Sequence, residues 1–383
     1  MNKKLVSNIM YLATVQGCNY LLPLLTLPIL VRTLGADGYG KLGFYLAMIN
    51  YFVLVTDFGF NLSASREVSL HRGDKERISV SFSRVMFAKF FLLVCCFLVL
   101  VVLIFCISRF SEDKLVLFSS FLMVFGSFLF PQWLFIGLEK MKQIAILNGV
   151  SKLLSLPLII LMVKEPEDVW LGAFAFGVSY LVSGALALVY VFKNRMVNIS
   201  FVSFSDIKAQ MYDSFHLFLS SASVNLYTTT TIVLLGVVTN DTVTGFYIAA
   251  DKLRMAVQGL INPISQAVYP RVSSLYSSNK QSAMVFLKKL LVWQSAFCFF
   301  LSLMLYIFSE FIVITIYGVG YDRTTLVLKI LSILPLIIGI SNVLGIQVMI
   351  NLGYKKQFSR VLLIGGVFNI VCIVPFAIKF NEI

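Results

Sequence analysis

Residues 83–107 read SRVMFAKFFLLVCCFLVLVVLIFCI, and the eighteen residues from Phe90 to Ile107 include no charged side chain. A helix of about 20 apolar residues crosses the ~30 Å hydrocarbon core of a bilayer. The strands of a membrane barrel would instead alternate between apolar and polar residues over about ten positions. The stretch does not alternate, so it predicts a membrane-spanning helix.

The composition extends this prediction to the whole chain. Of its 383 residues, 59% are hydrophobic and 13% are charged, whereas a soluble domain carries about 25% charged residues. We therefore expect an all-α polytopic membrane protein, since helices satisfy their own backbone within lipid. The apolar runs predict eleven spans, at about 9–31, 42–62, 83–107, 115–137, 143–163, 168–192, 212–238, 243–268, 286–309, 324–350 and 358–379.

The net charge of +13 is explained by the loops rather than by nucleic-acid binding. With a cytoplasmic N-terminus, the inside segments hold sixteen lysines and arginines and the outside segments hold seven. The positive-inside rule favours this orientation. The longest connections, about 61–82, 193–211 and 269–285, are then cytoplasmic.

Signals for metal sites and for catalysis are missing from the sequence. The six cysteines fall within apolar spans and form no CxxC pair, and the two histidines, His71 and His216, belong to no ligand pattern. The chain also lacks HExxH, GxSxG and P-loop motifs. We expect no metal and no cofactor, and a protein that is not an enzyme.

A short internal repeat suggests two related halves. The sequence GFYLA opens the second predicted span at Gly43, and GFYIA opens the eighth at Gly245, 202 residues later. Both spans enter from the same side, which is the plan of a parallel repeat of six spans. The halves would be residues 1–205 and 206–383. Two copies need about 404 residues, 21 more than the chain has, so we expect that a twelfth span is missing, through truncation or natural loss. The alternative is that two spans have been merged into one.

Polar residues at helical spacing mark one face of the eighth predicted span. They are Tyr247, Asp251, Arg254, Gln258, Asn262 and Ser265. Asp251 and Arg254 are three residues apart and can form an ion pair. Such a stripe is unfavourable against lipid, so it faces protein or water. Two interpretations stay open: hydrogen bonding between helices and the lining of a functional cavity.

Further polar groups lie in other predicted spans: Gln16 and Asn19 in the first, Asn50 and Asp57 in the second, and Lys152 in the fifth. Lys89 and Lys329 lie close enough to span ends to snorkel towards water. Five membrane-level cations (Lys89, Lys152, Lys252, Arg254 and Lys329) face two anions, Asp57 and Asp251. An excess of positive charge favours an anionic substrate, and arginine and lysine are the usual partners of phosphate.

Two sets of motifs resemble those of the polysaccharide-transporter family. The first half contains Ser7-Asn8-Ile9, Pro28, Arg32, Leu34-Gly35, Tyr39-Gly40, Tyr45, Asp57-Phe58-Gly59 and Ser65-Arg66-Glu67. The second half contains Thr244-Gly245-Phe246-Tyr247, Lys252-Leu253, Pro263-Ile264 and Tyr269-Pro270-Arg271. The resemblance covers almost the whole chain and is to the O-antigen flippases (Wzx-type) of the multidrug/oligosaccharidyl-lipid/polysaccharide exporter superfamily.

This resemblance implies twelve helices in two six-helix bundles around a central cavity. It implies transfer of an undecaprenyl-diphosphate-linked oligosaccharide across the bacterial inner membrane, for O-antigen and lipopolysaccharide biosynthesis. Arg66, Lys252 and Arg254 would then contact the substrate, together with Lys152, while Asp57 and Asp251 would be their charge partners or would couple transport to a proton or sodium ion. Membrane lipids, a glycan polymerase and a chain-length regulator are the expected partners, and nucleic acid is not.

Two alternatives to a flippase stay open from the sequence. The first is an ion-coupled multidrug antiporter of the same superfamily, which the excess of positive charge disfavours. The second is a membrane glycan polymerase or ligase, which usually needs a large outer loop that this chain lacks.

Overall fold

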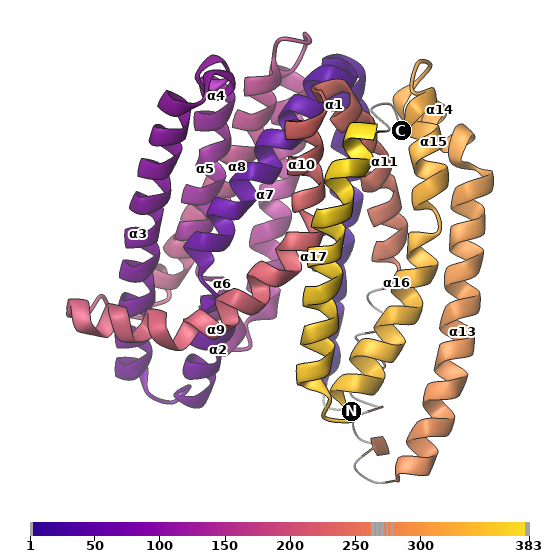
Figure 1. Ribbon diagram of the computed structural model, residues 1–383. Helices are drawn as coiled ribbons and strands as arrows, with labels where there is room; N and C mark the ends of the chain where they lie inside the picture. The colour runs from indigo at the N-terminus through magenta and orange to yellow at the C-terminus, as the bar shows by residue number, and fades with distance from the viewer. Residues whose placement is uncertain are drawn as a thin grey trace. The chain divides into compact units, whose positions relative to one another are not determined.

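The computed structural model describes residues 3–261, 265, 268, 272, 275, 276 and 279–379, and the regular elements of these residues are all helices. The chain packs as two compact units (Figure 1). The first comprises Met1–Cys18 and Lys41–Val233, and the second comprises Asn19–Gly40 and Leu234–Ile383. The predicted halves, 1–205 and 206–383, describe transport bundles and stay a prediction.

Helices α1 and α10 contribute residues to both units, and the other helices belong to one unit each. The shared helices are α1 (Lys3–Asp57) and α10 (Thr230–Val238). The first unit adds α2 (Phe60–Leu70), α3 (Lys75–Cys106), α4 (Ser108–Glu112), α5 (Lys114–Leu129), α6 (Gln132–Gly137), α7 (Met141–Met162), α8 (Val169–Lys193) and α9 (Phe204–Thr228). The second adds α11 (Asp241–Gly259), α13 (Lys280–Ile307), α14 (Ser309–Tyr317), α15 (Asp322–Leu331), α16 (Leu334–Asn342), the π-helical η1 (Val343–Ile350) and α17 (Lys355–Lys379).

Eight segments of the described chain are long and apolar enough to cross a membrane. The first, Leu24–Leu70, contains both the end of the first predicted span and all of the second. The predicted spans at 212–238 and 243–268 coincide with α9–α10 and with α11, which fall outside these eight. The protein is therefore a multi-pass helical membrane protein, and the count of eleven spans stays a prediction.

Helix α1 is interrupted at a glycine, and a longer loop was expected there. The predicted spans 9–31 and 42–62 leave a connection at about 32–41 between them. The structure instead has a single non-helical residue inside α1, Gly35, with φ 69° and ψ 179°. Positive φ favours glycine because it has no Cβ. One residue is therefore enough to break the helix, and the predicted loop is wrong.

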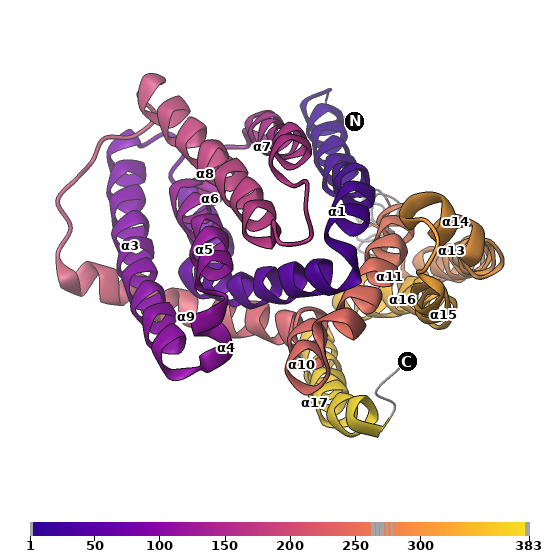
Figure 2. The same ribbon diagram turned by 90° about the horizontal axis from the view of Figure 1, so that it is seen from above.

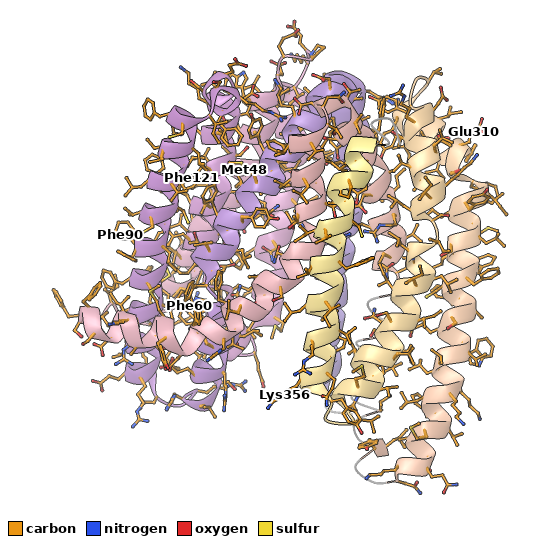
Figure 3. All side chains as sticks on the ribbon, viewed as in Figure 1. Met48, Phe60, Phe90, Phe121, Glu310 and Lys356 are labelled. Atoms are coloured by element: carbon orange, nitrogen blue, oxygen red, sulfur yellow. The ribbon has the colours of Figure 1, made fainter. Side chains whose placement is uncertain are left out.

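Close backbone packing holds α5 against α8 in the first unit. Figures 1 and 2 show α5, α7 and α8 side by side. A Cβ built on Gly126 would overlap the backbone of Tyr180, and one on Gly184 would overlap the carbonyl of Gly126. Small residues that let helices approach are typical of helix packing in membranes. Outside this contact, Phe90 projects from α3 and is 53% exposed (Figure 3), as expected for a side chain that faces lipid.

The second unit is organised around α11. Gly245 of α11 packs directly on the backbone of Ala36 and Gly40 in α1. Tyr317 of α14 donates from its hydroxyl to the carbonyl oxygen of Ala249, at 2.9 Å. Residues far apart in the sequence thus fix α11 within its unit, and this helix carries the polar stripe predicted from the sequence.

Candidate functional site

The sequence Asp57-Phe58-Gly59 forms the break between α1 and α2. Phe58 has φ 39° and Gly59 has φ 75°, so two consecutive residues lie in the left-handed region. A bulky residue is strained there. The ring of Phe58 stacks on that of Phe218 in α9, with centroids 4.7 Å apart and planes 11° apart. This stacking holds the turn and leaves Asp57 as the last residue of α1.

Asp57 forms an ion pair with Lys89 of α3. The distance from Lys89 Nζ to Asp57 Oδ1 is 2.8 Å, and the lysine side chain is 1% exposed against 26% for the aspartate. A carboxylate at a helix C-terminus is unfavourable because the helix dipole is negative there. The ammonium of Lys89 offsets both the charge of the Asp57 carboxylate and the negative end of the α1 dipole. Lys89 therefore does not snorkel towards water, which corrects the expectation from its position in the span.

Pro131 accounts for a second contact of Lys89. Its Nζ donates to the carbonyl oxygen of Ser127 in α5, at 2.8 Å. That carbonyl would normally accept from the N–H of residue 131, which a proline lacks. The proline thus frees an acceptor, and the buried ammonium gains a second hydrogen bond.

Asp251 and Arg254 form the second buried ion pair, on α11. Arg254 Nε donates to Asp251 Oδ1 at 2.7 Å, and the two side chains are 10% and 8% exposed. Their spacing of three residues predicted this pairing, which the structure contains. Among the described residues, Nε makes the only hydrogen bond of this guanidinium.

Gln258 lies one turn beyond Arg254 on the same face of α11. Its side chain is buried, with the residue 9% exposed, yet neither Nε2 nor Oε1 has a hydrogen-bond partner in the described structure. Leaving a buried amide without partners costs about 1–3 kcal/mol on the scale of protein mutations. Tyr247, one turn before Asp251, is half-buried. The face thus combines a charged pair with an amide that has unused donors and acceptors.

The other predicted substrate-binding residues are more exposed. Lys252 and Arg66 are exposed, and Lys152 is half-buried. Asn50, predicted to line a cavity, is exposed. The side chains of Gln16, Asn19 and Asn262 lie outside the described residues. None of these observations tests the predicted roles, which stay predictions.

Sequence reasoning missed two ion pairs that join different helices. Lys89 was interpreted as a membrane-level cation close enough to a span end to snorkel, and its link to Asp57 required knowledge of which helices touch. The same holds for Asp113, which accepts from Tyr45 at 2.8 Å and pairs with Lys41 at 3.2 Å. For both pairs, the only signal in the sequence was one acidic and one basic residue within or near predicted membrane spans.

Three comparisons place the chain among known proteins. Residues 5–276 match the family described as "Polysaccharide biosynthesis protein". The chain is 36% identical over 376 residues to an Escherichia coli (strain K12) protein named "Putative O-antigen transporter", covering 98% of this chain and 91% of that one. It is 31% identical over 373 residues to a Shigella dysenteriae protein of the same name, covering 96% and 92%.

Solved structures show the same fold. The lipid II flippase MurJ in an inward closed conformation matches with a TM-score of 0.72 and 15% identity, covering 98% of this chain and 82% of that chain. An inward-facing multidrug resistance MATE family transporter of the MOP superfamily matches with a TM-score of 0.69 and 15% identity, covering 94% and 87%. At 15% identity, both matches concern the fold of this chain. The chain belongs to the polysaccharide biosynthesis protein family, and it shares its fold with the MurJ and MATE proteins of known structure.

Proposed function

We propose that this protein is a flippase that transfers undecaprenyl-diphosphate-linked oligosaccharide repeat units across the bacterial cytoplasmic membrane. Its family and the names of its two relatives support transport in O-antigen biosynthesis. The MurJ and MATE folds support alternating access, in which two helical bundles rock about a substrate site. We place these bundles at residues 1–205 and 206–383, with eleven spans and a cytoplasmic N-terminus.

The observation that carries the proposal is that, among the described residues, the guanidinium of Arg254 forms a hydrogen bond only through Nε. The bond from Arg254 Nε to Asp251, at 2.7 Å, fixes the side chain, and we assign the two Nη groups of Arg254 to an anion. Arginine binds phosphate oxygens through two parallel hydrogen bonds when such an edge is free. A diphosphate fits this requirement. Gln258, with its unpaired buried amide, would then bind hydroxyl or phosphate oxygens beside it.

The remaining predicted residues define how the substrate would arrive. Arg66 and Lys252 are exposed cations, and we assign them to attraction of the diphosphate before it reaches Arg254. Lys152 would contact the same charged group. Asp57 and Asp251, each in an ion pair, are the candidates for coupling to a proton or sodium ion, because both would have to change partners for an ion to bind.

The experiment begins with a strain in which the gene is deleted. We expect lipid-linked repeat units to accumulate in the cytoplasmic leaflet and surface polysaccharide to be lost, and the wild-type chain to restore it. Arg254→Ala should abolish this restoration, while Arg254→Lys should retain part of it. Arg360→Ala, which removes an exposed arginine of α17, is the matched control and should restore export fully. Surface glycan at the wild-type level in Arg254→Ala, at equal protein abundance, would refute the assignment.

Transport of drugs is the second candidate, because the fold also matches a multidrug transporter. The net positive charge at membrane level argues against it, since cationic drugs prefer buried carboxylates. Expression in a drug-sensitive strain separates the two. Raised resistance without restored surface polysaccharide would favour the antiporter.

A further inference from the structure

We propose that residues 193–213, called the surface segment below, bind the anionic phospholipid surface of the inner leaflet. The surface segment includes the end of α8, the connection to α9 and the first turns of α9. Figure 1 shows α9 beginning beyond α3 and crossing it near its lower end, instead of running alongside it. All of these residues belong to the first unit.

The apolar stretch of α3 shows at which depth in the membrane the surface segment lies. This uninterrupted stretch, from Val85 to Cys106, contains 22 residues, about 33 Å of helix at 1.5 Å per residue, which matches the ~30 Å hydrocarbon core. Lys89 is the only charge in this stretch, and it is paired with Asp57. The residues before Val85 therefore lie at the headgroup level or beyond it.

Hydrogen bonds attach the surface segment to α3 at that level. The N–H of Asn198 donates to Ser79 Oγ, and the N–H of Ser200 donates to Ser83 Oγ, both at 2.9 Å. The two serines are four residues apart, one helical turn, so they bind alternate residues of the extended connection. The surface segment is therefore held just outside the hydrocarbon core as measured along α3.

The beginning of α9 is fixed there as well. Ser203 and Asp206 form a capping box, in which each side chain binds the backbone N–H of the other. Asp206 Oδ1 also pairs with Arg84 Nη2 of α3, at 3.3 Å. The Ser203 hydrogen bonds, followed by the charge of Arg84, hold the pKa of Asp206 below its ordinary value. This carboxylate is therefore ionised and engaged within the protein.

Large apolar side chains of the surface segment point away from the protein. Phe201 is fully exposed, and Ile199, Phe204 and Tyr212 are 72%, 71% and 79% exposed. Soluble surfaces rarely gather such side chains over a short stretch. Aromatic residues are enriched at the boundary between lipid and water. Their position beside the hydrocarbon level of α3 favours insertion among lipid headgroups and the first acyl carbons.

The exposed charges on the surface segment are mainly positive. Lys193, Arg195 and Lys208 are exposed, and Asp213 is the exposed acid that opposes them. Asp206 is already paired with Arg84. Basic residues beside apolar anchors favour anionic lipids, which concentrate in the cytoplasmic leaflet. The positive charge, together with the depth in the membrane inferred from α3, is why we assign the surface segment to lipid and not to a partner protein.

The test measures the depth of single spin labels in nanodiscs of phosphatidylcholine with phosphatidylglycerol. Labels are placed by Phe201→Cys, Phe204→Cys and Tyr212→Cys in a variant whose six cysteines are replaced and which still restores surface polysaccharide. Arg77→Cys in the first turn of α3 marks water, and Val99→Cys in its apolar stretch marks hydrocarbon.

We expect the three labels to be less accessible to a water-soluble nickel chelate than the label at 77, with an oxygen accessibility between those of the labels at 77 and 99. Nickel accessibility equal to that at 77 would overturn the proposal. Low nickel accessibility together with an oxygen accessibility below that at 77 would also overturn it, because shielding from both reagents would indicate a protein contact.

A second measurement tests the charge. Raising phosphatidylglycerol should lower the nickel accessibility of the label at 204, and the triple variant Lys193→Glu, Arg195→Glu, Lys208→Glu should lose this shift. The matched triple variant Lys280→Glu, Lys288→Glu, Lys289→Glu, at exposed lysines of α13, should keep it. A shift that persists in the first triple variant would refute recognition of anionic lipid.

Discussion

Lys89 Nζ lies 2.8 Å from Asp57 Oδ1, and this ion pair joins the end of α1 to the membrane-spanning helix α3. The lysine is 1% exposed, so almost no water compensates its charge if the partner is removed. The same ammonium binds the carbonyl that Pro131 leaves without a donor. One side chain thus secures the turn that contains the family motif Asp57-Phe58-Gly59.

Replacing Asp57 alone should destabilise the protein more than replacing both partners. Breaking a buried ion pair costs about 3–5 kcal/mol because the remaining charge stays buried. For Asp57→Leu we expect about 3 kcal/mol or more, since the charge left behind is the fully buried Lys89. Asp57→Leu with Lys89→Met should recover much of this loss. Thermal unfolding in detergent gives the comparison, and a double variant less stable than the single one would contradict it.

Gly59→Ala should destabilise the turn between α1 and α2. Gly59 has φ 75°, and a Cβ there would lie 2.7 Å from the backbone nitrogen of Phe218. We expect a cost of about 1–3 kcal/mol, typical of a residue forced into a strained backbone region. Gly73→Ala is the control, because a Cβ at Gly73 would meet nothing within 4 Å. Equal melting temperatures for the two variants would count against this reading of the turn.

The sequence predicted those features that depend on neighbouring residues. The helical membrane class follows from apolar runs such as 90–107, and the Asp251–Arg254 pair follows from a spacing of three on one helix. Both depend only on the geometry of a single helix. Such geometry is the same before and after the helices assemble.

Features that depend on contacts between helices could not be predicted in this way. The partner of Asp57 is 32 residues distant, and its identity depends on how α1 and α3 meet. The break at Gly35 replaced a predicted loop, because one glycine with positive φ can do what a loop does. The surface segment was predicted only as a loop, since nothing in its sequence showed that Ser79 and Ser83 would bind it.

The attachment of the surface segment should not change between about pH 8 and pH 5. The pKa of Asp206 is held below its ordinary value by Ser203 and by Arg84. A group whose pKa is lowered by folding contributes stability above its unfolded pKa and loses it only as the pH falls through the folded value. An aspartate titrates near pH 4 when unperturbed, so the loss falls below about pH 4. The nickel accessibility of a label at Phe204 checks this, and release of the label between pH 8 and pH 5 would contradict it. Asp206→Asn should remove the ion pair with Arg84 at every pH.

Gln258 offers a test in which stability and transport should separate. Its buried amide has no partner in the described structure, so Gln258→Leu removes a desolvation penalty and should leave the protein as stable as before or about 1 kcal/mol more stable. If the amide binds substrate beside Arg254, export of surface polysaccharide should nevertheless fall.

Gln294→Leu is the matched control, because Gln294 is also buried but donates to the carbonyl of Gly339 at 3.0 Å. That variant should lose about 0.5–1.5 kcal/mol of stability, because one hydrogen bond is removed while the carbonyl of Gly339 still accepts from the N–H of Val343. Melting temperature and surface glycan are measured for both variants. Full export in Gln258→Leu would remove this residue from the substrate site.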